Sequence, residues 1–140
     1  MSVEVVEIGA AADRLWSTAV DLFRGVRHDQ HDRFLSDPAT VAFVAHDGGD
    51  VVGWAWGYRQ LRADGDSMLL LYEIEVVESE RRQGVGRSLV EAFLELGRLE
   101  GHRRMWLLTE ADNREAVALY ESIGGERSLS DKLYYSWQLR

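Results

Sequence analysis

The chain has 140 residues, 46% of them hydrophobic and 29% charged, with a formal net charge of −8. This length and composition predict one globular domain over residues 1–140. The absence of cysteine excludes disulfides, thiolate metal sites and a cysteine nucleophile, while the acidic balance argues against a nucleic-acid partner and favours cationic substrates.

The sequence carries no sign of a membrane or targeting segment. Its first ten residues contain no basic leader, and no apolar run approaches the about 20 residues that a membrane-spanning helix needs. We therefore expect a cytoplasmic protein with no membrane partner.

Hydrophobic periodicity predicts the elements of the first half of the chain. In chain order they are a strand at 3–8, a helix with Leu15, Ala19, Leu22, Phe23 and Val26 on its buried face, a polar stretch at 27–37 with a helical turn at 33–35, and strands at 41–45 and 51–58. The sequence Asp-Gly-Gly-Asp at 47–50 is a turn signal, so the last two strands are expected to form a hairpin.

The second half alternates strands and helices. Its expected elements are a strand at 68–77, a helix at 84–100 with Val85, Leu89, Phe93 and Leu96 on one stripe, a strand at 105–109, a helix at 113–123 and a strand at 133–139. Antiparallel hairpins followed by a strand–helix–strand unit predict an α/β (α+β) fold. Its mixed, mostly antiparallel central sheet would have a parallel crossover and helices on both faces.

A glycine-containing turn joins the 68–77 strand to the helix after it. Gly84 and Gly86 lack side chains, so backbone N–H groups can approach a ligand closely. The first turn of the helix adds unpaired N–H groups and the positive end of the helix dipole. Arg81, Arg82 and Arg87 add cationic charge to a chain that is otherwise acidic. The residues therefore predict a binding site for an anion, although a plain helix start with solvated arginines fits them as well.

Two motifs resemble the GNAT superfamily of N-acetyltransferases. The segment Arg81-x-x-Gly84-x-Gly86 is similar to the acyl-CoA diphosphate loop of that family. The segment at 113–124, with Asn113, Ala116, Leu119, Tyr120 and Gly124, is similar to its later Asn-x-x-Ala-x-x-Leu-Tyr-x-x-x-Gly helix. Gly125 stands where the family pattern has an aromatic residue. A narrower likeness, to the aminoglycoside 3-N-acetyltransferase branch, rests on the Arg-Arg-Gln-Gly and Ala-Val-Ala-Leu-Tyr runs.

The resemblance implies acetyl-CoA as co-substrate, no metal, and a splayed strand pair that admits the pantetheine arm. The residues expected to contact acetyl-CoA are Ile74, Val76, Arg81, Arg82, Gln83, Gly84, Val85, Gly86, Arg87, Asn113 and Tyr120. The backbone N–H of Val76 or Val77 is expected to bind the thioester carbonyl. Asn113 is also a natural helix N-cap.

The resemblance also implies catalytic roles. Glu73 is the first candidate for the general base and Glu75 the second, because a strand places residues two apart on one face. A structural alternative is that one or both pair with arginines. Tyr120 is expected to protonate the departing thiolate, unless it is simply an amphipathic core residue.

The expected reaction acetylates a primary amine of a small cationic acceptor, with an aminoglycoside as the first choice. Polyamine, amino-acid and protein amines are alternatives, and so is a non-catalytic acyl-CoA-binding module. Substrate-binding candidates are Asp29, Asp32, Glu73, Glu75 and Trp54. Asp29 and Asp32 lie in a His- and Asp-rich stretch that also suggests metal ligands, although a solvated loop explains it better. Trp106 and Trp137 are expected in the core or an interface, and Tyr134, Tyr135 and Trp137 are compatible with a homodimer contact.

Overall fold

The computed structural model describes residues 2–9, 13–25, 31–128 and 133–140. A five-stranded sheet of order β1-β2-β3-β4-β5 forms its centre. The strands are β1 (Val3–Glu7), β2 (Thr40–Asp47), β3 (Asp50–Leu61), β4 (Ser67–Val76) and β5 (Met105–Trp106). The pairs β1–β2, β2–β3 and β3–β4 are antiparallel, and β5 is parallel to β4. This confirms the mixed, mostly antiparallel sheet that the sequence predicts.

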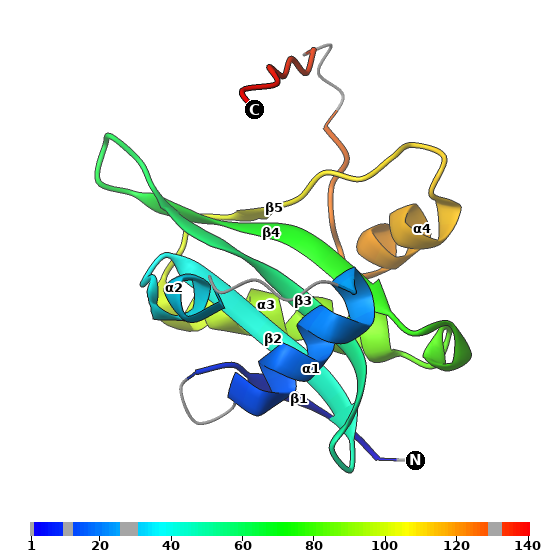
Figure 1. Ribbon diagram of the computed structural model, residues 1–140. Helices are drawn as coiled ribbons and strands as arrows, with labels where there is room; N and C mark the ends of the chain where they lie inside the picture. The colour runs from blue at the N-terminus through cyan, green and yellow to red at the C-terminus, as the bar shows by residue number, and fades with distance from the viewer. Residues whose placement is uncertain (1, 10–12, 26–30, 129–132) are drawn as a thin grey trace.

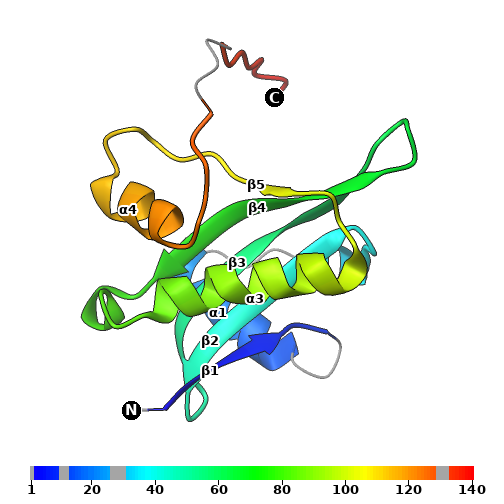
Figure 2. The same ribbon diagram turned by 180° about the vertical axis from the view of Figure 1, so that it is seen from behind.

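Helices pack on both faces of the sheet (Figure 1). The helices are α1 (Asp13–Arg24), α2 (His31–Ser36), α3 (Val85–Glu100) and α4 (Arg114–Ser122), and a short 3-10 turn, η2 (Glu78–Glu80), precedes α3. Figure 2 shows α3 in front of the sheet, on the face opposite α1. The α3 crossover is what makes β5 parallel to β4.

Two apolar clusters fill the layers between helices and sheet. On one face, Val85, Leu89 and Phe93 of α3 are buried as predicted and pack against the sheet. On the other face, α1 contributes Trp16, Ala19 and Val20 to a cluster that includes Trp54 of β3. No helix in the described part of the chain is long and apolar enough to cross a membrane.

The prediction for the buried face of α1 is wrong at Leu22. Its side chain is 50% exposed. The buried stripe runs through Trp16, Ala19 and Val20 instead, because Trp16 stacks on Phe34 and packs against Trp54 and so fixes the rotation of the helix. The last expected member of the stripe, Val26, lies outside the described residues.

The predicted strand at 133–139 is not present, since residues 133–140 form no strand in the structure. The paired part of β5 has only two residues, so the sheet offers little edge for a further strand. Trp137 and Tyr134 are exposed, which corrects the expectation of a core position for Trp137. Trp106 is not a core residue either, and its indole N–H donates to Gln60 Oε1 at 2.8 Å.

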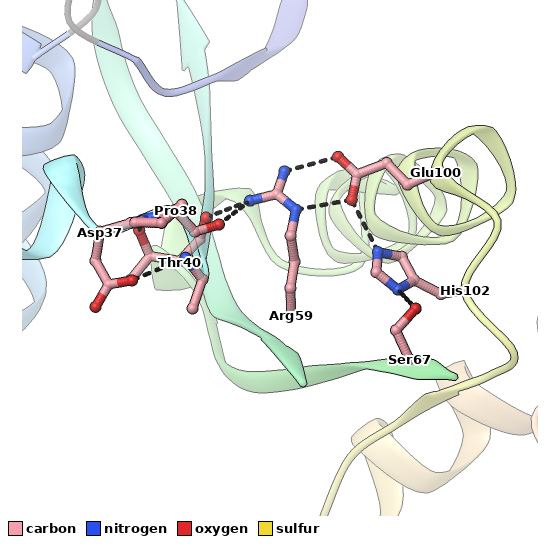
Figure 3. A network of polar contacts seen from close by, with 8 residues as sticks. Asp37, Pro38, Thr40, Arg59, Ser67, Glu100 and His102 are labelled. Atoms are coloured by element: carbon pink, nitrogen blue, oxygen red, sulfur yellow. Dashed lines mark hydrogen bonds and ion pairs between the residues drawn. The ribbon is translucent and has the colours of Figure 1, made fainter. Parts of the chain in front are cut away.

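A polar network ties the far end of β3 to the end of α3 (Figure 3). Arg59 donates from Nε and Nη2 to the two carboxylate oxygens of Glu100, each at 2.7 Å. Its Nη1 donates to the carbonyl oxygen of Thr40 at 2.8 Å. His102 bridges Glu100 and Ser67 through its two ring nitrogens, at 2.8 Å each. The Arg59 guanidinium lowers the pKa of Glu100 to about 2.

Candidate active site

A cleft of about 930 Å³ opens where β4 and β5 separate. The two strands are paired only at Leu69–Met105 and Leu70–Trp106. Figure 2 shows that the chain diverges from β4 once β5 has ended and then runs toward α4. The cleft is lined by residues 71–76 of β4, by the turn before α3, by residues 107–109 and by α4. The splayed strand pair that the resemblance implied therefore corresponds to a real opening in the structure.

The backbone of β4 directs polar groups into this opening. Val77 N–H donates to Val52 carbonyl oxygen at 2.9 Å, so Val77 is not available to a ligand and that alternative is wrong. This bond flanks the Gly53–Val76 pair, so the polar groups of Val76 point away from β3. Arg81 Nε accordingly reaches the Val76 carbonyl oxygen at 3.2 Å. By strand alternation Ile74 has the same orientation, and both residues line the cleft.

The turn before α3 forms an amide-rich end of the cleft. Gly84 is the N-cap of α3, with φ 86°, and Arg82 is the one non-glycine residue with positive φ in the described part of the chain, at 65°. Because residues 85–87 form the first turn of α3, their amide N–H groups have no carbonyl oxygen of a preceding turn to which they could donate. A left-handed residue just before a helix start turns successive N–H groups toward one point, which suits an anion.

The arginines of the turn are held by acidic and polar partners. Arg82 donates from Nη2 to Glu115 Oε1 at 2.9 Å. Arg87 donates to Glu91 Oε1 at 3.1 Å, and both side chains are about half exposed. Surface pairs of this kind contribute only about 0.2–1 kcal/mol, so an anion bound in the cleft can compete for both arginines.

Most residues expected to contact acetyl-CoA line the cleft. They are Ile74, Val76, Arg81, Arg82, Gly84, Gly86, Arg87, Asn113 and Tyr120. Two do not line it. The Val85 side chain is buried in the core, so only its backbone is available. The Gln83 amide donates to Ser79 carbonyl oxygen at 3.3 Å.

Helix α4 places Tyr120 in the cleft. Asn113 is the N-cap of this helix and accepts a hydrogen bond from Ala116 N at 3.1 Å, as its helix-capping alternative predicted. Tyr120 is partly buried, and burial raises the pKa of its phenol. The group thus stays protonated around neutral pH and can donate a proton. Gly125 closes the helix through a bond from its N–H to Tyr120 carbonyl oxygen at 2.9 Å, where a Cβ would be too close.

Glu73 and Glu75 lie on the α1 face of β4, opposite Trp56 and Trp54, respectively. Glu73 Oε2 accepts a hydrogen bond from Trp56 Nε1 at 2.8 Å, and Glu73 Oε1 pairs with Arg24. Both glutamates line the cleft. In the described part of the chain, Glu75 has no ion pair. Among the described residues, the structural alternative of an arginine partner is thus present at Glu73 and absent at Glu75.

The expected acceptor wall differs from the prediction. Trp54 is 2% exposed and packs between Trp16 and Phe23, so its ring cannot line a substrate pocket. Trp56 stacks with exposed Tyr72 at a centroid distance of 4.9 Å. The sequence did not predict the position of Tyr72, which depends on a bulge in β4 opposite Gly57. The glycine inside the strand predicted at 51–58 is the signal that indicates such a bulge.

The remaining acceptor candidates fall outside the described side chains. Asp29 belongs to residues 26–30, which are outside the described residues, and Asp32 is described only as part of helix α2. Among the residues that the structure describes, no group of three or more His, Asp or Glu side chains is placed to hold a metal ion.

Sequence comparison identifies the relatives of the chain. The model of the acetyltransferase (GNAT) family matches residues 10–125. N-acetyltransferase 8 of Rattus norvegicus is 31% identical over 97 residues, which are 68% of this chain and 43% of that protein. Ribosomal protein bS18-alanine N-acetyltransferase of Escherichia coli is 37% identical over 65 residues, which are 46% of this chain and 44% of that protein. The matched regions cover less than half of these curated relatives.

Solved structures share the fold over the whole chain. An aminoglycoside acetyltransferase from an uncultured soil metagenomic sample superposes with a TM-score of 0.84, at 21% identity, over 100% of both chains. AAC(6')-Iy in complex with a bisubstrate analog superposes with a TM-score of 0.81, at 20% identity, over 99% of both chains. At these identities the likeness extends to the architecture alone.

Proposed function

The chain belongs to the acetyltransferase (GNAT) family, and from this premise we propose that it transfers an acetyl group from acetyl-CoA to a primary amine of a small cationic acceptor. One observation carries this proposal. A single cleft has an amide- and arginine-rich end at residues 81–87, an opening along β4, and carboxylates at Glu73 and Glu75. An anionic carrier and a cationic acceptor are thus attracted to different parts of one cleft.

The cationic end fits the diphosphate of coenzyme A. The amides of residues 85–87 and the side chains of Arg82 and Arg87 would bind it, at about 1.5–3 kcal/mol for each charge-assisted hydrogen bond. The gap beside β4 admits the pantetheine arm. Val76 N–H donates to the thioester carbonyl oxygen, where a backbone donor contributes about 2.7–4 kcal/mol.

The acidic end fits the amine. At pH 7 a lysine-like ammonium with a pKa of about 10.4 costs about 4.6 kcal/mol to deprotonate. Glu73 or Glu75 accepts this proton, directly or through water, and so produces the neutral amine that attacks. When bound, acetyl-CoA supplies the activated acetyl group. Tyr120 gives its phenolic proton to the sulfur that leaves, and the proton that the attacking nitrogen loses on forming the amide restores the phenol.

The acceptor class follows from charge and from the structural neighbours. An aminoglycoside acetyltransferase solved with sisomicin superposes with a TM-score of 0.86 over 97% of both chains. Aminoglycosides carry several ammonium groups and would suit the two carboxylates. Two positions are candidates for acetylation: the 3-N position, from the sequence resemblance, and the 6' position, from the name of the structural neighbour AAC(6')-Iy.

A panel of amines tests the proposal. Purified protein with acetyl-CoA is incubated with aminoglycosides, polyamines, amino acids and a peptide with a free N-terminal alanine. Free CoA is followed with a thiol reagent, and products are identified by mass. Acetylated aminoglycoside supports the proposal. Acetylation of the peptide alone would favour a protein acceptor, and thermal stabilisation by acetyl-CoA without CoA release would favour a non-catalytic binding module.

A further inference from the structure

The proposed general base is not free in this structure. Glu73 has two partners, and they come from different elements. Arg24, the last residue of α1, pairs with Oε1 through its Nη2 atom, and Trp56 of β3 donates to Oε2. Both carboxylate oxygens are therefore engaged.

The two sides of this ion pair differ in how tightly they are held. The Glu73 side chain is 11% exposed and fixed by the Trp56 indole, whereas the Arg24 side chain is 51% exposed. A carboxylate removed from water needs a cation beside it. Arg24 provides that cation from a flexible side chain at a helix end, with Gly25 following in the left-handed conformation. Arg24 is consequently the partner that can leave.

The surroundings of Glu73 suit an organic cation. Tyr72 is largely exposed and stacks on Trp56, and Glu75 lies two residues along the same strand. Aromatic faces attract ammonium and guanidinium groups by about 0.5–2 kcal/mol. Glu75 and the Trp56–Tyr72 pair thus flank Glu73, the carboxylate with which the Arg24 guanidinium pairs.

We propose that Arg24 determines acceptor specificity, because its guanidinium occupies the cation subsite on Glu73 and must be displaced by the ammonium group of the acceptor. This inference rests on the proposed function and goes beyond it. An acceptor with a well-placed ammonium replaces Arg24 and keeps the Glu73 carboxylate paired. A neutral acceptor cannot replace the lost ion pair and therefore binds more weakly than a cationic one.

Substitution of Arg24 tests the competition. We expect Arg24→Met to lower the KM for sisomicin by about threefold to tenfold, because the acceptor no longer displaces an ion pair. The KM for acetyl-CoA should not change. Arg24→Lys retains a cation and should stay near the wild-type KM. Arg14→Met removes a positive charge from the start of the same helix and serves as the control for net charge.

A binding measurement tests the same step without catalysis. Protein labelled with ¹⁵N-tryptophan is titrated with ethylammonium chloride, and sodium chloride is the ionic-strength control. The indole signal of Trp56, assigned with Trp56→Phe, reports the Glu73 contact. The ethylammonium concentration at which the Trp56 signal has moved halfway is the titration midpoint. In Arg24→Met this midpoint should be about threefold to tenfold lower than in wild type.

The outcomes are distinct. An unchanged or higher KM for sisomicin in Arg24→Met, or an equal decrease in Arg14→Met, would contradict the proposal. Equal ethylammonium midpoints, or no movement of the Trp56 signal, would contradict it as well. If no amine of the panel is acetylated but the midpoints differ as expected, the subsite on Glu73 stands and the proposed acetyl transfer fails.

Discussion

Gly57 lies so close to Leu70 that a Cβ atom on Gly57 would be 1.8 Å from the Leu70 carbonyl oxygen. The contact occurs at an irregularity in the β3–β4 ladder, where Gly57 pairs with Leu71 but its neighbour Trp56 pairs with Glu73. Tyr72 is the extra residue of this bulge. Because Gly57 has no side chain, this bulge can form, and it turns both Tyr72 and Glu73 toward Trp56.

We expect Gly57→Ala to destabilise the protein strongly. The added methyl group would overlap backbone atoms that cannot move without opening the ladder, so a loss of at least about 3 kcal/mol is expected. Urea unfolding followed by circular dichroism measures it. Gly9→Ala is the control, because nothing lies within 4 Å of a Cβ there. Equal unfolding midpoints for the two variants would show that the bulge does not depend on glycine.

Local patterns predicted much of the fold. The α3 stripe, the 47–50 turn and the mixed, mostly antiparallel character of the sheet depend on periodicity and turn chemistry, which neighbouring residues determine. The turn that places Gly84 at the start of α3 was also predicted, because Gly84 and the helix start are adjacent in sequence. The position of Arg82 at positive φ carries no such signal.

Contacts between distant residues were not predictable. Arg24 and Glu73 are 49 positions apart in the sequence. Their ion pair depends on where the last turn of α1 lies over the sheet, which is a matter of tertiary packing. The bulge at Tyr72 depends on Gly57, fifteen residues earlier on another strand, as the register shows. The strand expected at 133–139 has a good alternating pattern, but pairing also needs an edge, and the two-residue β5 offers almost none.

Loss of the Tyr120 hydroxyl should slow turnover. Burial raises the pKa of this phenol, so it keeps its proton and can donate it to a leaving thiolate. We expect Tyr120→Phe to lower kcat by at least about tenfold, within the usual range for acid–base catalysis. Release of free CoA measures kcat. Tyr134→Phe is the control at an exposed position. Wild-type kcat in Tyr120→Phe would exclude the phenol from the mechanism.

The two glutamates should be separable by charge-neutral substitution. If Glu73 is the base, Glu73→Gln should lower kcat by about 10²-fold or more. The loss should be greatest at low pH, since more of the amine is already neutral at high pH. Glu75→Gln is the matched variant on the same face of β4. The pH–rate profile decides between them, and a wild-type profile in Glu73→Gln with a loss in Glu75→Gln would assign the base to Glu75.

Gly84 should matter for acetyl-CoA beyond its effect on stability. Gly84 and Gly65 have nearly the same positive φ, 86° and 87°, and neither has an atom within 4 Å of an added Cβ. Alanine at either position should therefore cost about 1 kcal/mol of stability through backbone strain. Only Gly84→Ala should also weaken acetyl-CoA binding in calorimetric titration, because it distorts the turn that orients the amides of α3. Equal acetyl-CoA affinities in the two variants would contradict a role of this turn in binding acetyl-CoA.

The Arg59–Glu100 pair should make stability depend on pH. The hydrogen bonds from Arg59 lower the pKa of Glu100 from 4.5 to about 2. A lowered pKa in the folded state means that the stabilisation is fully present above about pH 4.5 and is lost as the pH falls toward 2. The Glu100 side chain is 32% exposed, so solvent screening should reduce the effect to roughly 1–2 kcal/mol.

Urea unfolding of wild type and Glu100→Gln between pH 3 and 7 measures this contribution to stability. The difference in the free energy of unfolding should be largest near neutral pH and shrink below pH 4.5, whereas a constant difference would show that the ion pair does not control the titration of Glu100.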